Sequence, residues 1–325
     1  MSHSKKLTGV ILAAGKGTRI RPLSLHYPKP LLPVCNKPII QYQLEQLKRI
    51  GVDEVFIVVG HLKETVLKAL GDGEALGMTL HYVDQGETLG IAHAVYKLED
   101  QIQTPFMLFL GDILIHAPRL ERMVDMFWNR RAGGVLAVKR EPDPEMIRRN
   151  FAVILHASGL VTRVIEKPRF ANTNLKGCGI YLFDLPIFDA IRRTPRTTQR
   201  DEYEITNSIQ ILIDDGYPVY PAEVVEWDMN VTVAADVLQV NQVWRETMGV
   251  DQVIGRNVSL HPNARLGQGA IVGDNVRIET PITVRNSVIF AGSVVTGEWD
   301  LDNYVVTPED NIYCGPNGSG DGSPA

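Results

Sequence analysis

The 325-residue chain has few cysteines, no long hydrophobic run and no excess of positive charge. Its three cysteines, Cys35, Cys178 and Cys314, lack metal-ligand spacing and leave one unpaired, which indicates reduced thiols in a cytoplasmic protein rather than a disulfide framework. The net charge of -5 disfavours nucleic-acid binding. The strongest apolar runs, Val55 to Val59 and Phe106 to Leu110, are too short to span a bilayer, and the polar first eight residues do not form a signal peptide. We therefore expect no nucleic-acid or membrane partner.

What the chain does contain, up to about Met248, is a regular alternation of strand and helix patterns. Apolar runs rich in β-branched and aromatic residues alternate with stretches whose apolar residues recur at spacings of three and four. Such an alternation predicts an α/β fold with a doubly wound, mostly parallel sheet covered by helices on both faces. The predicted strands are Val10–Ala13, Val55–Val59, Thr79–Val83, Phe106–Leu110 and Val135–Val138, and the predicted helices are Ile39–Ile50, Leu62–Leu70, Gly90–Leu98 and Arg119–Arg131.

The region from Phe151 to Asp184 has shorter, alternating strand patterns and predicts a mixed-sheet insert that forms one wall of a pocket. Its predicted strands are Phe151–His156, Val161–Glu166 and Gly179–Phe183. A helix at Glu202–Asp215, a strand at Pro218–Ala222 and a closing helix at Asp236–Met248 would complete the domain.

After Val253 the apolar period changes to six residues. A repeat of six resembles the hexapeptide repeat of left-handed parallel β-helices, in which flat faces stack and bury the periodic residues. We thus expect a first, α/β domain over residues 1–250, a short β-helix over 251–314 and a Gly/Ser/Pro-rich disordered tail over 315–325. The periodic positions are Ile254, Leu260, Leu266, Val272, Ile278, Val284 and Phe290, with no slip along the repeat.

The most informative segment runs from Leu12 to Pro33. A strand leads into Gly15 and Gly17, then Arg19, and Lys29 stands between two prolines. Glycines let backbone N–H groups approach an anion, and two cationic side chains can neutralise a polyphosphate. The spacing fits neither a Walker loop, since no Ser or Thr follows the Gly-Lys pair, nor a dinucleotide fingerprint, which needs a third glycine. The loop therefore predicts triphosphate binding of another kind.

The whole string, LAAGKGTRIRPLSLHYPKPLLP, resembles the signature loop of the sugar-1-phosphate nucleotidylyltransferases. Within that family the chain most resembles the long-form glucose-1-phosphate thymidylyltransferases, whose LxVN ending it matches at Leu238-Gln239-Val240-Asn241. The resemblance covers nearly the whole chain. It implies a Rossmann-like nucleotidyltransferase fold, with the nucleotide bound by Leu12, Ala14, Gly15, Gly17 and Thr18, and with Arg19 and Lys29 in catalytic roles.

Asp112 follows a buried strand, where a carboxylate is well placed to hold Mg²⁺ together with phosphate oxygens, although an isolated Asp more often caps a turn. Asp228 is the second candidate, and the resemblance implies that both aspartates bind the metal. Gln85 offers an amide that can read a nucleobase edge, and its spacing to Gly90 is that of the family's pyrimidine-contacting glutamine.

Glu166-Lys167-Pro168 ends a predicted strand and by itself could be a solvated ion pair. The resemblance implies that Glu166 binds sugar hydroxyls and that Lys167 binds the phosphate of the sugar phosphate. It also implies that Ala152, Gly179 and Tyr181 line the sugar-phosphate site.

Four positions depart from the family pattern. This chain has Ile113 where the family usually has Asn, Ala152 where it mostly has Gly, Asn207 in place of Asp and Asn230 in place of Gly. These departures bear on substrate preference more than on the reaction.

The resemblance thus implies an Mg²⁺-dependent enzyme that joins a nucleoside triphosphate, dTTP or UTP, to glucose 1-phosphate and releases pyrophosphate. The alternatives are GTP with mannose 1-phosphate, UTP with N-acetylglucosamine 1-phosphate, or an inactive nucleotide-sensing subunit of the same fold. An acyl-transferring β-helix is disfavoured because the repeat makes little more than two coils. For the β-helix we favour a role in packing or in forming a homo-oligomer (dimer, trimer or tetramer) instead.

Overall fold

The computed structural model describes residues 6–170, 172–198 and 201–315. These residues form two compact units. The first runs up to Gly15 and resumes from Gln43 to Asp228, and the second holds Lys16–Tyr42 and the residues from Met229 onward. The chain therefore leaves the first unit at the glycine-rich loop and returns to it within one helix, α1 (Ile39–Arg49).

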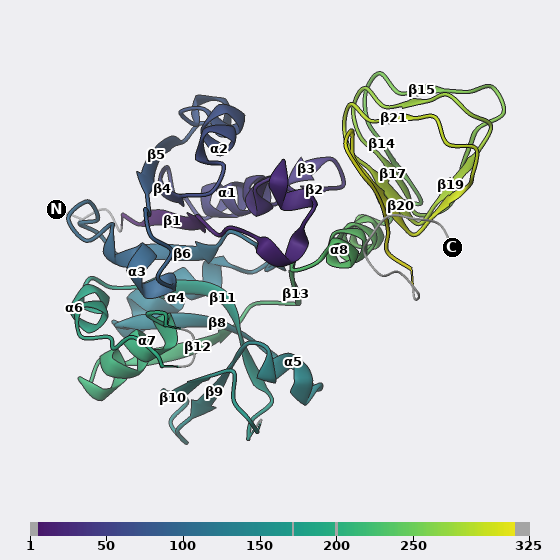
Figure 1. The fold of residues 1–325 in the computed structure, drawn as a ribbon. Coiled ribbons are helices and arrows are strands. Elements are labelled where there is room, and N and C mark those ends of the chain that lie inside the picture. Colours follow the sequence, from purple (N-terminus) through teal and green to yellow (C-terminus); the bar gives the residue numbers. More distant parts are fainter. Residues whose placement is uncertain (1–5, 171, 199–200, 316–325) are drawn as a thin grey trace. The chain divides into compact units, whose positions relative to one another are not determined.

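A nine-stranded sheet forms the centre of the first unit (Figure 1). Its strands are β1 (Thr8–Ala13), β4 (Glu54–Val59), β5 (Thr79–Asp84), β6 (Phe106–Leu110), β8 (Gly134–Arg140), β9 (Phe151–Leu155), β10 (Val161–Glu166), β11 (Leu175–Phe183) and β12 (Val219–Glu223). They pair in the order β10-β9-β11-β6-β1-β4-β5, and β8 pairs with both β11 and β12. The run β6-β1-β4-β5 and the pair β8-β12 are parallel, whereas β11 is antiparallel to its neighbours. The predicted α/β fold with a mostly parallel central sheet is confirmed.

Helices cover this sheet because its central strands are apolar on both faces. Val10, Leu108 and Leu136 point to one face, where they join a core with α3, α6 and α7, and the alternate residues of the same strands point to the other. On the sheet, α4 packs against β8, β11 and β12. The helices of this unit after α1 are α2 (Lys63–Leu70), α3 (Ile91–Tyr96), α4 (Glu121–Arg130), α5 (Pro144–Arg148), α6 (Pro186–Arg192) and α7 (Ile205–Asp214).

The predicted bounds of most strands lie within two residues of the observed bounds, and for β6 and β10 the two agree. Helices α5 and α6 and the short strand β7 (Ile113–His116) were not predicted. In addition, β11 begins at Leu175, four residues before the predicted strand. Strand β13 (Trp227–Asn230) follows Glu226, whose backbone N–H donates to the His116 carbonyl (3.0 Å).

In the second unit, α8 (Ala234–Thr247) precedes a region of short strands, drawn green to yellow in Figure 1. We call residues 253–313 the coil region, because their strands follow one another in successive turns of the chain. Strands β14 to β23 are distributed in rotation over three sheets, and the pairs between them are parallel. Among the strands that the structure describes in this region, β24 alone pairs antiparallel. The strands are β14 (Val253–Ile254), β15 (Ser259–Leu260), β16 (Arg265–Leu266), β17 (Ala270–Val272), β18 (Arg277–Ile278), β19 (Thr283–Arg285), β20 (Ser287–Ile289), β21 (Val294–Val295), β22 (Leu301–Asp302), β23 (Tyr304–Val306) and β24 (Asn311–Tyr313).

The six-residue repeat holds through Val284 but then slips by one residue, which corrects the sequence prediction. Val253 pairs with Ile271, three full repeats further along the chain, whereas Val272 pairs with Ile289, one position short of three repeats. The slip arises because a single residue, Asn286 (φ 42°), turns the chain between β19 and β20. Phe290, predicted as the last periodic position, is therefore not in the ladder, and Ile289 takes its place in the core of the coil region. Of the predicted tail, 316–325 lies outside the described residues.

Candidate active site

Strands β1, β4 and β6 end together at one edge of the first unit's sheet. The backbone N–H of Gly111 donates to the Leu12 carbonyl (2.9 Å). A Cβ on Gly60 would lie 2.8 Å from the Ala14 oxygen, so this approach of two chain segments requires glycine. The structure thus brings together Leu12, Ala14 and the segment that carries Asp112. The carboxyl ends of parallel strands are the edge at which α/β sheets bind ligands.

Two residues predicted to bind the nucleotide, Gln85 through the base and Gly90, lie beside each other after β5. The buried Gln85 side chain donates from Nε2 to the Gly90 carbonyl (3.3 Å), and its backbone N–H donates to Val59 at the end of β4 (2.9 Å). Gly90 has φ 107°, and a Cβ there would lie 2.6 Å from the Tyr203 carbonyl oxygen. Glycine is therefore required at 90 both by its backbone conformation and by the close contact.

The rest of the signature loop belongs to the second unit. Gly17 has φ 60°, and the chain turns there into a short 3₁₀ helix that contains the exposed Thr18 and Arg19. A Cβ on Gly17 would lie 3.2 Å from Cε of Lys29, so the two predicted residues are neighbours. Lys29 is only 7% exposed. A cationic group removed from water attracts a neighbouring phosphate more strongly than an exposed one does. Gly15, the last residue of the first unit before this loop, is exposed.

Asp228, a predicted metal ligand, lies in a buried cluster of four charged side chains. The ammonium of Lys176 donates to both of its carboxylate oxygens (2.8 and 2.7 Å), and Lys139 lies 3.3 Å from one of them. Lys139 also pairs with Glu141 (2.9 Å). The side chains of Lys176 and Asp228 are 1% and 3% exposed. Two cations and two anions thus neutralise one another where unpaired charges would be costly.

The cluster shifts the pKa of two of its members. Burial alone would lower the pKa of Lys139, but its bonds to Glu141 and Asp228 outweigh burial and raise it. Burial alone would raise the pKa of Glu141, yet hydrogen bonds from the Lys139 ammonium and the Asp143 backbone N–H lower it. Both groups are therefore charged at neutral pH.

The predicted donor set for a metal consists of two carboxylates, those of Asp112 and Asp228. Within the described ranges, no group of three or more His, Cys, Asp and Glu residues could hold a metal ion. Both oxygens of Asp228 also accept bonds from Lys176, so a metal would have to share them. Hard oxygen donors in this number fit Mg²⁺ that takes its remaining ligands from phosphate and water, rather than an all-protein metal site.

The predicted sugar-phosphate residues Glu166 and Lys167 lie at the end of β10. Glu166 accepts a long hydrogen bond from the Thr206 hydroxyl on α7 (3.5 Å). Lys167 is exposed, has φ 40° and is held by its backbone N–H, which donates to the Asn150 carbonyl (2.8 Å). A left-handed conformation is rare for lysine and directs the chain sharply at this point.

The other three residues of that prediction are buried. Ala152 (1% exposed) pairs with Lys176 across β9 and β11. Gly179 has φ 74°, and a Cβ there would lie 2.8 Å from Cδ1 of Ile113. The Tyr181 ring (2% exposed) is stacked between two phenylalanines at 6.0 and 5.6 Å, so in this structure it packs the core.

A family model described as nucleotidyl transferase matches residues 8–247. The chain belongs to this family. Two similar proteins come from Haloferax volcanii. The low-salt glycan biosynthesis nucleotidyltransferase Agl11 is 35% identical over 73% of this chain and 66% of its own length. The UTP–glucose-1-phosphate uridylyltransferase AglF is 35% identical over 71% of this chain and 93% of its own length. A glucose-1-phosphate thymidylyltransferase of Streptomyces griseus is 33% identical over 90% of this chain and 80% of its own length. The chain spans about two thirds of Agl11. The predicted resemblance to sugar-1-phosphate nucleotidylyltransferases is confirmed.

Other relatives and structures agree on the family but differ in substrate. Mannose-1-phosphate guanylyltransferase 1 of Arabidopsis thaliana is 28% identical over 87% of this chain and 79% of its own length. A Bacillus anthracis protein assigned as a glucose-1-phosphate thymidylyltransferase, solved with sucrose, superposes with a TM-score of 0.67 and 26% identity, over 74% of this chain and 96% of that one. The relatives thus include thymidylyl-, uridylyl- and guanylyltransferases.

Sequence reasoning missed two residues that contact the predicted metal ligand Asp228, namely Lys176 and Lys139. A lysine in a short strand pattern normally indicates a solvated face. The partner that lets Lys176 be buried, Asp228, lies 52 residues further along the chain. The available signal was charge balance: a buried carboxylate needs a cation nearby, and Lys176 stands three residues before the predicted strand that begins at Gly179.

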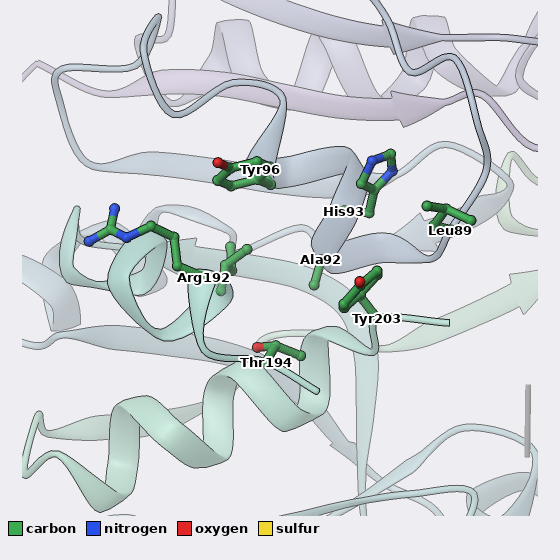
Figure 2. Close-up of a pocket in the computed structure, with 8 residues that line it drawn as sticks. Leu89, Ala92, His93, Tyr96, Arg192, Thr194 and Tyr203 are labelled. Carbon is green, nitrogen blue, oxygen red and sulfur yellow. The ribbon is translucent and has the colours of Figure 1, made fainter. Parts of the chain in front are cut away.

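A pocket of about 500 Å³ in this nucleotidyltransferase is lined by Leu89 of the Gln85–Gly90 segment and by none of the predicted site residues. Figure 2 shows His93 and Tyr96 projecting from one helix, α3, with Tyr203 on the neighbouring segment. The Tyr203 backbone N–H donates to the Leu89 carbonyl (2.8 Å), so the pocket wall supports the segment that is predicted to read the base. Burial lowers the pKa of His93, whose ring is stacked on Tyr203 at 6.4 Å, in keeping with a structural role. The lining residues are Leu89, Ala92, His93, Tyr96, Ile191, Arg192, Thr194 and Tyr203.

No helix in the described ranges is both long enough and apolar enough to span a membrane.

Proposed function

We propose that this nucleotidyltransferase transfers a nucleotidyl group from a nucleoside triphosphate to a sugar 1-phosphate, releasing pyrophosphate. The observation that carries the proposal is that β1, β4 and β6 end at one sheet edge, where Leu12, Ala14 and Asp112 lie. The chain belongs to a family of nucleotidyl transferases, which supports the same reaction.

The chemistry follows from charge. A sugar 1-phosphate is anionic at neutral pH, so one of its oxygens can attack the α-phosphorus in line without a general base, and no covalent nucleophile is needed. The difficulty is to bring two polyanions together and to stabilise the leaving pyrophosphate. In this proposal Arg19 offsets the triphosphate charge, and Lys29 and Lys167 steer the sugar phosphate. A magnesium ion, when bound, would neutralise triphosphate oxygens, and Asp112 and Asp228 would hold it.

We propose dTTP or UTP as the nucleotide and glucose 1-phosphate as the sugar phosphate. Gln85 supports a pyrimidine, because its amide is fixed at Gly90 in the segment where the family reads the base. The names of the similar proteins from Haloferax and Streptomyces support the same pair. GTP with mannose 1-phosphate is the second candidate, favoured by the guanylyltransferase from Arabidopsis.

We further propose that the coil region is a left-handed parallel β-helix. Successive strands from β14 to β23 belong to three sheets in turn, and each strand from β14 to β20 pairs in parallel with the strand three further along, which supports this proposal. We also propose that the protein works in the cytoplasm as a homo-oligomer, and that residues 1–250 and 251–314 are its functional domains.

A substrate panel tests the function. Pyrophosphate release is measured for every combination of dTTP, UTP, GTP, CTP and ATP with glucose, mannose and N-acetylglucosamine 1-phosphates, with magnesium present. We expect turnover for a pyrimidine triphosphate with glucose 1-phosphate and little for Asp112→Asn. If turnover is highest with GTP and mannose 1-phosphate, that pair replaces the proposed pyrimidine triphosphate and glucose 1-phosphate as the substrates. Failure of every pair would overturn the reaction itself and favour a nucleotide-sensing subunit.

A further inference from the structure

The loop that carries Arg19 and Lys29 is attached to the coil region. Lys16–Tyr42 and the residues from Met229 onward form one compact unit, although the whole of Gln43–Asp228 separates them in the chain. We propose that the coil region holds this loop in place through Tyr27 and Asn36, and that both are positioning residues for nucleotidyl transfer. The inference rests on the proposed function, in which the loop binds the substrates' phosphates.

Tyr27 is the first attachment point, two residues before Lys29. Its ring meets the Phe290 ring edge-on, with centroids 5.2 Å apart and planes at 86°, a favourable aromatic geometry. Its hydroxyl donates to Glu309 in the segment before β24 (3.4 Å). Because the coil repeat slips by one residue, Ile289 rather than Phe290 packs in the core of the coil region, and Phe290 is left to make this contact. At 2% exposure it is nevertheless well buried.

Asn36 is the second attachment point, at the tip of the hairpin formed by β2 (Pro33–Val34) and β3 (Lys37–Pro38). Its side-chain Nδ2 donates to the Val272 carbonyl on β17 (2.8 Å). Asn36 has φ 67°, a conformation that asparagine tolerates better than most residues. The hairpin is thus bonded directly to the backbone of the coil region.

Helix α8 joins the hairpin and the coil region from a third side. The fully buried Asn241 accepts a bond from the Cys35 backbone N–H (2.7 Å) and donates to the Pro33 carbonyl (2.9 Å). The next residue, Gln242, donates to the Gly269 carbonyl of the coil region (2.8 Å). The hairpin, α8 and the coil region therefore form a single bonded network.

Lys29 lies between the two attachment points in sequence, and its stem packs beside Gly17. Fixing both ends of a segment restricts its backbone, so the ammonium is held in place before substrate arrives. Such preorganisation matters because a shift of about 1 Å in a positioning group can cost roughly 10²-fold in rate. The coil region would then serve catalysis as well as oligomer formation.

Two substitutions remove the attachments with little other change. Asn36→Gly deletes the amide while keeping a residue that adopts positive φ, and Tyr27→Leu deletes the ring. Asn257→Gly is the matched control, since Asn257 also has positive φ (54°) and makes an exposed amide bond, to Asn275, within the coil region. Tyr27→Phe keeps the ring contact and loses only the bond to Glu309.

The test measures backbone amide exchange over residues 17–35 by mass spectrometry, together with kcat and KM. In the Tyr27→Leu/Asn36→Gly variant we expect at least tenfold faster exchange in that segment and a kcat/KM lowered by about 10²-fold. Tyr27→Phe and Asn257→Gly should stay within about threefold of wild type. Should the double variant unfold, Asn36→Gly alone is read in the same way.

Unchanged exchange and unchanged kcat/KM after loss of both contacts would overturn the proposal. So would faster exchange with full activity, because the loop would then need no positioning. If the wild-type protein turns over no substrate pair, the proposed function fails, whereas the exchange data still decide whether the coil region holds the loop.

Discussion

Lys176 and Asp228 form a bidentate ion pair inside the first unit, with the ammonium 2.8 and 2.7 Å from the two carboxylate oxygens. Both side chains are almost completely buried. A carboxylate can be removed from water in this way only if a cation goes with it. The pair therefore fixes the orientation of an aspartate for which the family resemblance implies a role at the metal.

Lys176→Met should destabilise the first unit by roughly 3 kcal/mol, the lower end of the usual cost of breaking a buried pair, because Lys139 still neutralises part of the Asp228 charge. Urea unfolding followed by circular dichroism measures the change. The control is Arg140→Met, next to Lys139 on β8, which breaks an exposed pair with Glu223 and should cost less than about 1 kcal/mol. Equal losses in the two variants would contradict the role assigned to burial.

Glu141 should make the protein sensitive to acid. Its folded-state pKa lies below the unfolded value of about 4.3, so its stabilisation is present above that pH and is lost as the pH falls through the folded pKa. Wild type should be more stable than Glu141→Gln at pH 7, and the difference should shrink as the pH falls below about 4. Urea midpoints for both proteins at several pH values measure it. A constant difference across that range would show that Glu141 gains nothing from Lys139.

Gly90→Ala should disturb the base-reading segment, because the added Cβ would lie 2.6 Å from the Tyr203 carbonyl. The matched control is Gly86→Ala in the same segment, where φ is also positive but nothing lies within 4 Å of the new Cβ. Gly90→Ala should cost roughly 2 kcal/mol more than the control and raise the KM for the triphosphate at least tenfold. Denaturation and initial-rate kinetics provide the two readouts. If both variants behave alike, the contact with Tyr203 does not position the segment.

Asp112→Asn should lower kcat by about 10²–10³-fold while leaving stability within about 1 kcal/mol, because it removes a charge from the predicted metal site and little volume. Asp125→Asn, which changes an exposed carboxylate on α4, is the control and should leave kcat unchanged. Kinetics over a range of magnesium concentrations measure the effect. Full activity of Asp112→Asn at low magnesium would mean that the metal is not held there.

The sheet could be predicted from sequence wherever local pattern determines the structure. Phe106–Leu110 is a continuous apolar run between turn signals, and the strand has those bounds. The segments after β1, β4 and β6 meet at one sheet edge, in keeping with the rule that the carboxyl ends of parallel strands lie together. These features need only periodicity and topology, both of which can be read along the chain.

Contacts between distant residues could not be predicted in the same way. The start of β11 was missed because Lys176 interrupts the apolar pattern, and only its pairing with Asp228 explains its burial. The slip at Asn286 was missed because either Ile289 or Phe290 can fill a periodic apolar position. Likewise, nothing in the loop around Tyr27 indicates that its partner is a ring near the other end of the chain.

Transfer of label is the most direct test of the reaction. The protein is incubated with magnesium, glucose 1-phosphate and dTTP or UTP carrying ³²P at the α-position, under single-turnover conditions. Direct displacement predicts that the label passes into the nucleotide sugar and that none is bound to denatured protein. Label retained on the protein, or labelled nucleotide released without any nucleotide sugar, would contradict the account.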